Sequence, residues 1–141
     1  ADPKRAAELY LKACRGNEAM GCFSLGELVR EGKLDESYGD SPGPMYSRAI
    51  ELSKPPCAAG QAMDCLTVAD SLAALGQADK ANPLYKGAIP TLEKGCERGD
   101  FTTCLELEDL YRDGLGVEAS ADKAGNYRAR ACSIGAKVAC E

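Results

Sequence analysis

The chain has 141 residues, a net charge of −5, eight cysteines and no histidine. This length suits one domain with one contiguous core. The negative charge argues against nucleic-acid binding, which needs clustered positive charge facing phosphates, and no apolar run approaches the roughly 18–20 residues of a membrane span.

The first 32 residues predict a helical hairpin. The stretch PKRAAELYLKAC (3–14) is predicted as a helix, and it is followed by CRGNEAMGC (14–22). Asn17 tolerates the left-handed conformation that ends many helices. A second helix is predicted in FSLGELVREG (23–32), where apolar residues recur at helical spacing before a closing glycine.

The segment GKLDESYGDSPGP (32–44) is rich in Gly, Pro, Ser and Asp and predicts an exposed, mobile loop. A second hairpin follows, with helices in GPMYSRAIELS (43–53) and LTVADSLAALG (66–76). Proline removes a helical hydrogen bond and restricts the residue before it. Pro55 and Pro56 therefore predict that the first of these helices stops near Ser53 and that Cys57 lies in a turn.

In the third hairpin, Pro83 is expected near a helix start, whereas Pro90 falls inside the helix and should kink it. Its second helix is predicted in LELEDLYRDG (105–114), and a fourth first helix in ADKAGNYRARAC (121–132). The sequence ends before a second helix could run in this last unit. We expect either a natural end there or a fragment.

The cysteines reveal an internal repeat. Each consecutive pair encloses seven residues, and the first cysteines of successive pairs lie 36 to 43 residues apart. The third residue after each first cysteine is asparagine or glycine, as a left-handed helix cap requires. The predicted repeats cover 1–43, 44–77, 78–116 and 117–141.

The predicted hairpins also indicate the state of the cysteines. One cysteine ends the first helix and the other begins the second, so the two side chains face each other at a distance that a disulfide can bridge. The rival interpretations are zinc ligands, which usually have shorter spacings and often include histidine, and free thiols in a reduced adaptor of the cytosol or an intermembrane space. The pairing that the repeat favours is Cys14–Cys22, Cys57–Cys65, Cys96–Cys104 and Cys132–Cys140.

At this point the chain resembles a known family. DGLGVEASADKAGNYRARACSIG (113–135) and residues 1–32 resemble the Sel-one-like repeat, a relative of the tetratricopeptide repeat. The cysteine spacing is similar to that of the Helicobacter cysteine-rich proteins, which are disulfide-stapled and exported. The resemblance implies an all-α, right-handed solenoid of tandem αα-hairpins in one domain over 1–141, and a secreted or periplasmic bacterial protein. It is weaker in the second repeat.

Function is predicted on the first helices, which usually line the concave face of such solenoids and bind other chains. Residues 1–16, 44–58, 78–98 and 119–133 hold thirteen basic and seven acidic residues, while the remainder is strongly acidic. One interpretation is a basic groove for an acidic peptide or protein. The other is that neighbouring helices pair opposite charges, which contributes little per pair. The candidate contacts are Lys4, Arg5, Lys12, Lys80, Lys86, Lys123, Arg128 and Arg130.

Two further side-chain types recur in the repeats. A tyrosine occurs once per first helix, and methionines stand at equivalent positions before two of the second cysteines. We expect these side chains to pack between hairpins, with a ligand-stacking ladder as the alternative for the tyrosines. They are Tyr10, Tyr46, Tyr85, Tyr127, Met20 and Met63.

The enzymatic alternative comes from the family, because some relatives are described as penicillin-binding proteins or weak β-lactamases. The chain contains one S-x-x-K, from Ser120 to Lys123, but neither S-D-N nor K-T-G. Ser120 also stands where a helix N-cap belongs. We therefore predict a non-enzymatic, monomeric scaffold that needs no cofactor and no metal, with Ser120 as a cap.

Overall fold

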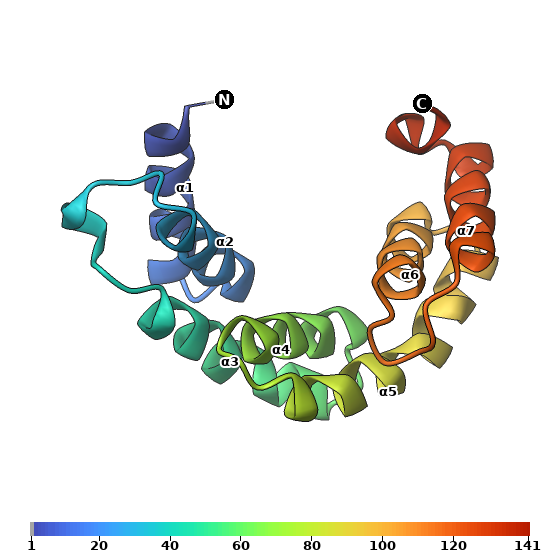
Figure 1. Ribbon diagram of the computed structural model, residues 1–141, viewed down its shortest axis with the longest axis horizontal. Coiled ribbons are helices and arrows are strands. Elements are labelled where there is room, and N and C mark those ends of the chain that lie inside the picture. Colours follow the sequence, from blue (N-terminus) through green and yellow to red (C-terminus); the bar gives the residue numbers. More distant parts are fainter. Residues whose placement is uncertain (1) are drawn as a thin grey trace. The chain divides into compact units, whose positions relative to one another are not determined.

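A computed structural model describes residues 2–141. In this part of the chain there are seven α-helices, two short 3-10 helices and no strand, which confirms the predicted all-α fold (Figure 1). The elements are α1 (Pro3–Arg15), α2 (Ala19–Arg30), η1 (Glu36–Tyr38), α3 (Gly43–Ala58), α4 (Ala62–Ala74), α5 (Ala78–Glu97), α6 (Phe101–Asp113), α7 (Ala121–Ile134) and η2 (Lys137–Cys140).

The first helices end where the repeat predicts. The residue three positions after each first cysteine has a positive φ, from 67° at Asn17 to 122° at Gly135. Glycine adopts this conformation without steric cost, and asparagine is among the residues that tolerate it best. Asn17 adds a contact that glycine could not make, because its side-chain oxygen accepts a hydrogen bond of 2.8 Å from Arg48 of α3.

The chain divides into two compact units, one ending at Ala81 and the other formed by Asn82–Glu141. In the first unit α2 packs against α1 and α3, and α3 pairs with α4. In the second unit α6 pairs with α7, which also contacts η2. The predicted single domain and its concave face stay predictions.

Each unit has its own buried apolar side chains. In the first unit Leu25, Tyr46 and Val68 are at most 2% exposed, and in the second Leu92, Leu107 and Leu110 are equally buried. Close helix packing needs small residues at the contact. A Cβ atom on Gly21 would lie 2.6 Å from the Cβ of Ala13, so α1 and α2 approach more closely there than a side chain would allow.

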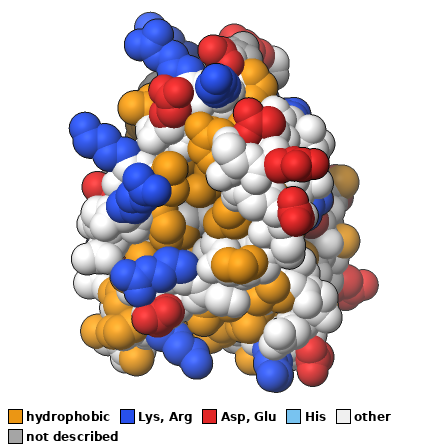
Figure 2. All heavy atoms as spheres, turned by 90° about the vertical axis from the view of Figure 1, so that its left-hand side faces the viewer, with side chains coloured by type: hydrophobic (Ala, Val, Ile, Leu, Met, Phe, Trp, Pro, Cys, Tyr) orange, Lys and Arg blue, Asp and Glu red, His pale blue; other side chains and the backbone are white. Residues whose placement is uncertain are grey.

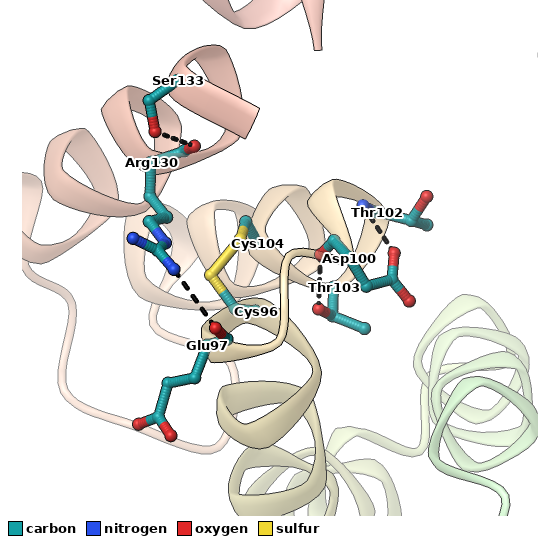
Figure 3. Close-up of a disulfide and its surroundings, with 8 residues drawn as sticks. All are labelled: Cys96, Glu97, Asp100, Thr102, Thr103, Cys104, Arg130 and Ser133. Atoms are coloured by element: carbon teal, nitrogen blue, oxygen red, sulfur yellow. Dashed lines mark hydrogen bonds between the residues drawn. A yellow bond between two sulfur atoms is a disulfide. The ribbon is translucent and has the colours of Figure 1, made fainter. Parts of the chain in front are cut away.

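All four predicted disulfides are present, with Cα–Cα distances of 4.6 Å to 4.9 Å. The first three join the end of a first helix to the first turn or two of the next helix, as Figure 3 shows for Cys96 and Cys104. The fourth joins α7 to Cys140, the last residue of η2. No free cysteine remains in the described residues. The prediction of disulfides rather than zinc ligands or free thiols is confirmed.

The predictions from proline are wrong in two places. Helix α3 does not stop near Ser53 but continues through Pro55 and Pro56 to Ala58, so Cys57 lies in its last turn. Both prolines still accept hydrogen bonds, from the N–H groups of residues 59 and 61, and the Cys57–Cys65 disulfide fixes this end of the helix. The free energy gained from these contacts exceeds the cost of the helical hydrogen bonds that the prolines cannot donate.

Pro83 does not start a helix either, because α5 begins at Ala78 and runs unbroken to Glu97 with Pro83 and Pro90 inside it. Pro83 is the sixth residue of the helix and has no N–H to donate, so one helical hydrogen bond is missing there. The helix continues in spite of this loss. The kink that we expect at Pro90 stays a prediction.

The segment between α2 and α3 is mostly exposed, as predicted, and contains the short helix η1. The Asp35 carboxylate accepts hydrogen bonds from the N–H and the hydroxyl of Ser37, which stabilise this turn. Among the helices of residues 2–141, none combines the length and hydrophobicity that crossing a membrane requires.

Candidate binding surface

The structure separates the eight predicted basic contacts into two groups. Lys4, Arg5 and Lys12 are exposed on α1, and Lys80 and Lys86 are exposed on α5. None of these five side chains forms an ion pair with a described residue. They are therefore available to a partner as charges, whereas the other three cations have partners within the chain.

Lys123, Arg128 and Arg130 of α7 stabilise the second unit. The ammonium of Lys123 lies 5.3 Å from the ring centre of Tyr111, a cation–π contact. Arg130 donates a hydrogen bond of 3.2 Å to the main-chain carbonyl of Glu97 at the end of α5 (Figure 3). These contacts hold α7 against its neighbours, and sequence spacing alone does not reveal them.

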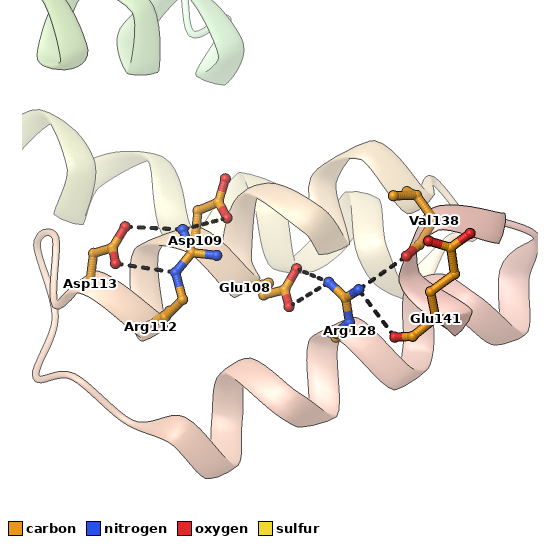
Figure 4. Close-up of polar contacts among 7 residues, drawn as sticks. All are labelled: Glu108, Asp109, Arg112, Asp113, Arg128, Val138 and Glu141. Carbon is orange, nitrogen blue, oxygen red and sulfur yellow. Dashed lines mark hydrogen bonds and ion pairs between the residues drawn. The ribbon is translucent and has the colours of Figure 1, made fainter.

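Arg128 forms the largest number of polar contacts among these three cations. It forms an ion pair of 3.2 Å with the Glu108 carboxylate, whose side chain is only 11% exposed. It also donates to the carbonyl oxygens of Val138 and Glu141 (Figure 4). One side chain thus joins α6, α7 and the residues after them.

The α1 surface, which we define as Lys4, Arg5, Leu9 and Lys12, is the best candidate for a binding face. Residues at spacings of three and four share one side of a helix, and Leu9 is 63% exposed beside the cations. Figure 2 shows one face of the molecule on which Lys and Arg side chains, with some Asp and Glu among them, lie along one edge beside hydrophobic side chains. Lys12 lies in the last turn of α1, where a cation complements the helix dipole. The pKa of Asp35 is lowered mainly by hydrogen bonds from Ser37, and the charge of Lys4 is among the smaller causes.

The alternative interpretation, pairing between neighbouring helices, explains little of the basic charge. Most ion pairs in the described residues lie within one helix, such as Arg30–Glu27 in α2 and Arg48–Glu51 in α3. Arg128–Glu108 is an ion pair that links two helices, α6 and α7. The cations of the first helices are thus largely unpaired.

Most tyrosines confirm the prediction of packing. Tyr46 and Tyr85 are 1% and 2% exposed. Tyr127 is half-buried and stacks on Tyr111, with ring centres 5.6 Å apart. Tyr127 also lines a pocket.

The methionines are partly exposed, although Met20 of the first hairpin contacts Thr67 of the second. Met20 and Met63 are 58% and 42% exposed, because their position before the second cysteine lies at the edge of each hairpin. The hydroxyl of Thr67 donates a hydrogen bond of 3.2 Å to the sulfur of Met20. Neither side chain fills the core.

A pocket of about 200 Å³ lies between α5 and α7 in the second unit. Sequence analysis missed it, because its residues come from two helices whose distance in space no local pattern encodes. A signal did exist, since Glu93 and Glu97 are four residues apart on one helix face. The lining residues are Glu93, Cys96, Glu97, Asn126, Tyr127 and Arg130.

A cluster of polar side chains, Glu27, Arg30 and Tyr46, joins α2 to α3. The buried Tyr46 hydroxyl donates to the Glu27 carboxylate, and Arg30 contacts both groups. Burial and the hydrogen bond to Glu27 raise the pKa of Tyr46 to about 12. Burial of Glu27 opposes ionisation, but hydrogen bonds from Arg30 and Tyr46 outweigh it and lower the pKa of this carboxyl. Each of the three side chains has a hydrogen-bond partner within the cluster, which is typical of a polar network that stabilises the fold.

Ser120 is the N-cap of α7, as predicted. Its hydroxyl oxygen accepts a hydrogen bond of 3.2 Å from the N–H of Lys123, while the ammonium of Lys123 lies over the Tyr111 ring. A serine nucleophile would need that lysine beside its hydroxyl. The described residues also contain no group of three potential His, Cys, Asp or Glu metal ligands.

Comparison with known proteins finds no matching family model and no matching curated protein. Two solved structures are similar. A Sel1 repeat protein from Oxalobacter formigenes is 21% identical, with a TM-score of 0.42 over 98% of this chain and 52% of that chain. Cysteine-rich protein B of Helicobacter pylori is 27% identical, with a TM-score of 0.37 over 99% of this chain and 92% of that chain.

The chain spans about half the length of the Sel1 repeat protein. These two proteins are of the kinds that the sequence motifs resemble. At these TM-scores we draw no conclusion about the site from either structure. The repeat architecture is supported by the helical hairpins and disulfides of this chain.

Proposed function

We propose that this protein is a non-enzymatic repeat scaffold that binds an acidic peptide or protein through its first helices. The observation that supports this most directly is the α1 surface, where three exposed cations without ion pairs to described residues flank the exposed Leu9. The carboxylates of Asp2 and Glu8 lie on the same side of α1, so the excess of positive charge there is small. Unpaired charge beside apolar area suits a partner that supplies carboxylates and apolar side chains.

The proposed compartment is the periplasm or the extracellular space, and the proposed state is a monomer. Four disulfides in a short chain suit an oxidising environment. Each closes a nine-residue loop and contributes roughly 2–3 kcal/mol by restricting the unfolded chain.

Binding of a synthetic acidic peptide tests the proposal. The probe is a dodecapeptide of alternating Glu and Leu with blocked ends, and its affinity is measured at low and high salt. We expect affinity to fall as salt rises, because exposed charges are screened. The triple variant Lys4→Gln, Arg5→Gln, Lys12→Gln should bind about tenfold more weakly, a loss of about 1.4 kcal/mol.

The control is a triple variant with the same net charge, in which three cations outside the first helices are replaced. An affinity that is independent of salt, or an equal loss in both triple variants, would contradict the α1 surface as the binding site. The control replacements are Lys33→Gln, Arg112→Gln and Lys137→Gln.

The enzymatic alternative is tested with a chromogenic β-lactam. We expect no turnover, because the Ser120 hydroxyl accepts the cap hydrogen bond and Lys123 contacts an aromatic ring. Turnover that Ser120→Ala abolishes would favour the enzyme, provided that Asp100→Ala, which removes the equivalent cap of α6, leaves it intact.

A further inference from the structure

The pocket between α5 and α7 has the chemistry of a cation site. Glu93 and Glu97 come from α5, while Asn126 and the half-buried Tyr127 come from α7. One wall is therefore acidic and the other is an aromatic ring with an amide beside it. All lining residues belong to the second unit, so the site is complete within it.

The two carboxylates are not neutralised by the structure. Neither Glu93 nor Glu97 forms an ion pair with a described residue, and like charges four residues apart destabilise a helix. Arg130 lines the same pocket but donates to the main-chain carbonyl of Glu97. Figure 3 shows the Glu97 carboxylate pointing away from that guanidinium.

The charges of the two pocket carboxylates act on Tyr127. Burial raises the pKa of Tyr127, and the charge of Glu93 is the next largest contribution, followed by smaller ones from Tyr111 and Glu97. The carboxylates thus act on the Tyr127 hydroxyl across the pocket. A cation placed there would face two carboxylates from α5 and the Tyr127 ring from α7, with the Arg130 guanidinium also in the lining.

We propose that this pocket binds an arginine side chain of a partner protein. A guanidinium is planar, stacks on an aromatic face and forms paired hydrogen bonds with a carboxylate, all of which the pocket offers. The proposal rests on the proposed function only in taking the arginine to belong to a peptide. The site lies in a different unit from the α1 surface and has the opposite charge, so each can be tested alone.

The probe is N-acetyl-arginine amide, whose ends are blocked, and the readout is the chemical shift of main-chain amides in the intact protein at low salt. We expect saturable shifts at Asn126 and Tyr127. N-acetyl-citrulline amide has nearly the same shape without the charge and should bind about tenfold more weakly. Equal affinity for the two probes, or no saturable shift with arginine amide, would overturn the proposal.

Substitutions assign the binding to the pocket. The double variant Glu93→Gln, Glu97→Gln should lose about tenfold in affinity, whereas Glu118→Gln, at an exposed position outside the pocket, should lose nothing. Tyr127→Phe keeps the ring and should retain binding, whereas Tyr127→Leu should not. Unchanged affinity in the double variant would overturn the site even if the probe bound elsewhere.

A peptide separates this proposal from the proposed function. A blocked Gly-Ser decapeptide with one central arginine should shift the same amides as the small probe, and the α1 triple variant should bind it equally well. Binding of the small probe without the peptide would overturn a partner side chain as the occupant. Loss of acidic-peptide binding alone would contradict the α1 surface and leave the arginine site standing.

Discussion

The hydroxyl of Tyr46 lies between two charged side chains of α2. It donates to Glu27 and accepts from Arg30, and the residue is 1% exposed. A phenolate in this position would be desolvated and would face the Glu27 carboxylate. The neutral phenol is therefore stabilised in the folded protein, because only the neutral phenol donates to Glu27.

This arrangement predicts an alkaline loss of stability. Because the folded-state pKa of Tyr46 is raised to about 12, its contribution is complete below the unfolded pKa of about 10 and is lost as pH rises through the folded value. We expect the free energy of unfolding to fall by about 2 kcal/mol more in the wild type than in Tyr46→Phe between about pH 10 and 12. Urea unfolding followed by circular dichroism measures this, with intact disulfides checked by mass spectrometry. Equal losses in both proteins would contradict the prediction.

At the scale of secondary-structure elements, an ion pair joins α6 to α7 in the second unit. Arg128 of α7 is 39% exposed at its side chain, but its partner Glu108 of α6 is nearly buried. Arg112 provides a contrast within the same unit, because it pairs with Asp109 and Asp113 of its own helix and all three side chains are about half-exposed (Figure 4). The two arginines differ in what their removal would leave behind.

We predict that Arg128→Met lowers the free energy of unfolding by about 2 kcal/mol, because it leaves a nearly buried carboxylate without its partner. Arg112→Met should cost less than about 0.5 kcal/mol, since its ion pairs are exposed. Chemical denaturation of both variants makes the comparison. Adding Glu108→Gln to Arg128→Met should recover part of the loss, and full additivity of the two substitutions would argue against a direct interaction.

At the scale of the whole molecule, the four disulfides differ in access to solvent. Cys96 and Cys104 are 3% and 0% exposed, whereas Cys140 is exposed to solvent. Cys14–Cys22 and Cys57–Cys65 fall between these extremes. Because thiol–disulfide exchange requires a thiolate to reach a sulfur atom, exposure should set the order of reduction.

We predict that limited reductant opens Cys132–Cys140 first and Cys96–Cys104 last. Alkylation of the released thiols at successive times, followed by peptide mapping, gives the order directly. The buried bridge should require local unfolding, so a low concentration of urea should accelerate its reduction more than that of Cys132–Cys140. Early loss of Cys96–Cys104, or loss of all four at one rate, would contradict this order.

Features that depend on neighbours along the chain could be predicted from sequence. The left-handed caps at Asn17 and Gly135, the pairing of each cysteine with the next, and the N-cap role of Ser120 all rest on backbone preferences over a few residues. The same local signal recurs in all four repeats, so these preferences reinforce one another along the chain.

Features that depend on contacts between helices were decided only by tertiary structure. Helix α3 continues through Pro55 and Pro56. Arg128 and Arg130 have partners within the chain that cannot be predicted from their positions in the sequence. Sequence alone determined the helical hairpins, their disulfides and the excess of basic residues on the first helices. Tertiary structure decided which of those cations stay unpaired and brought Glu93 and Tyr127 to one pocket, because side-chain contacts depend on distances between helices that the local sequence does not set.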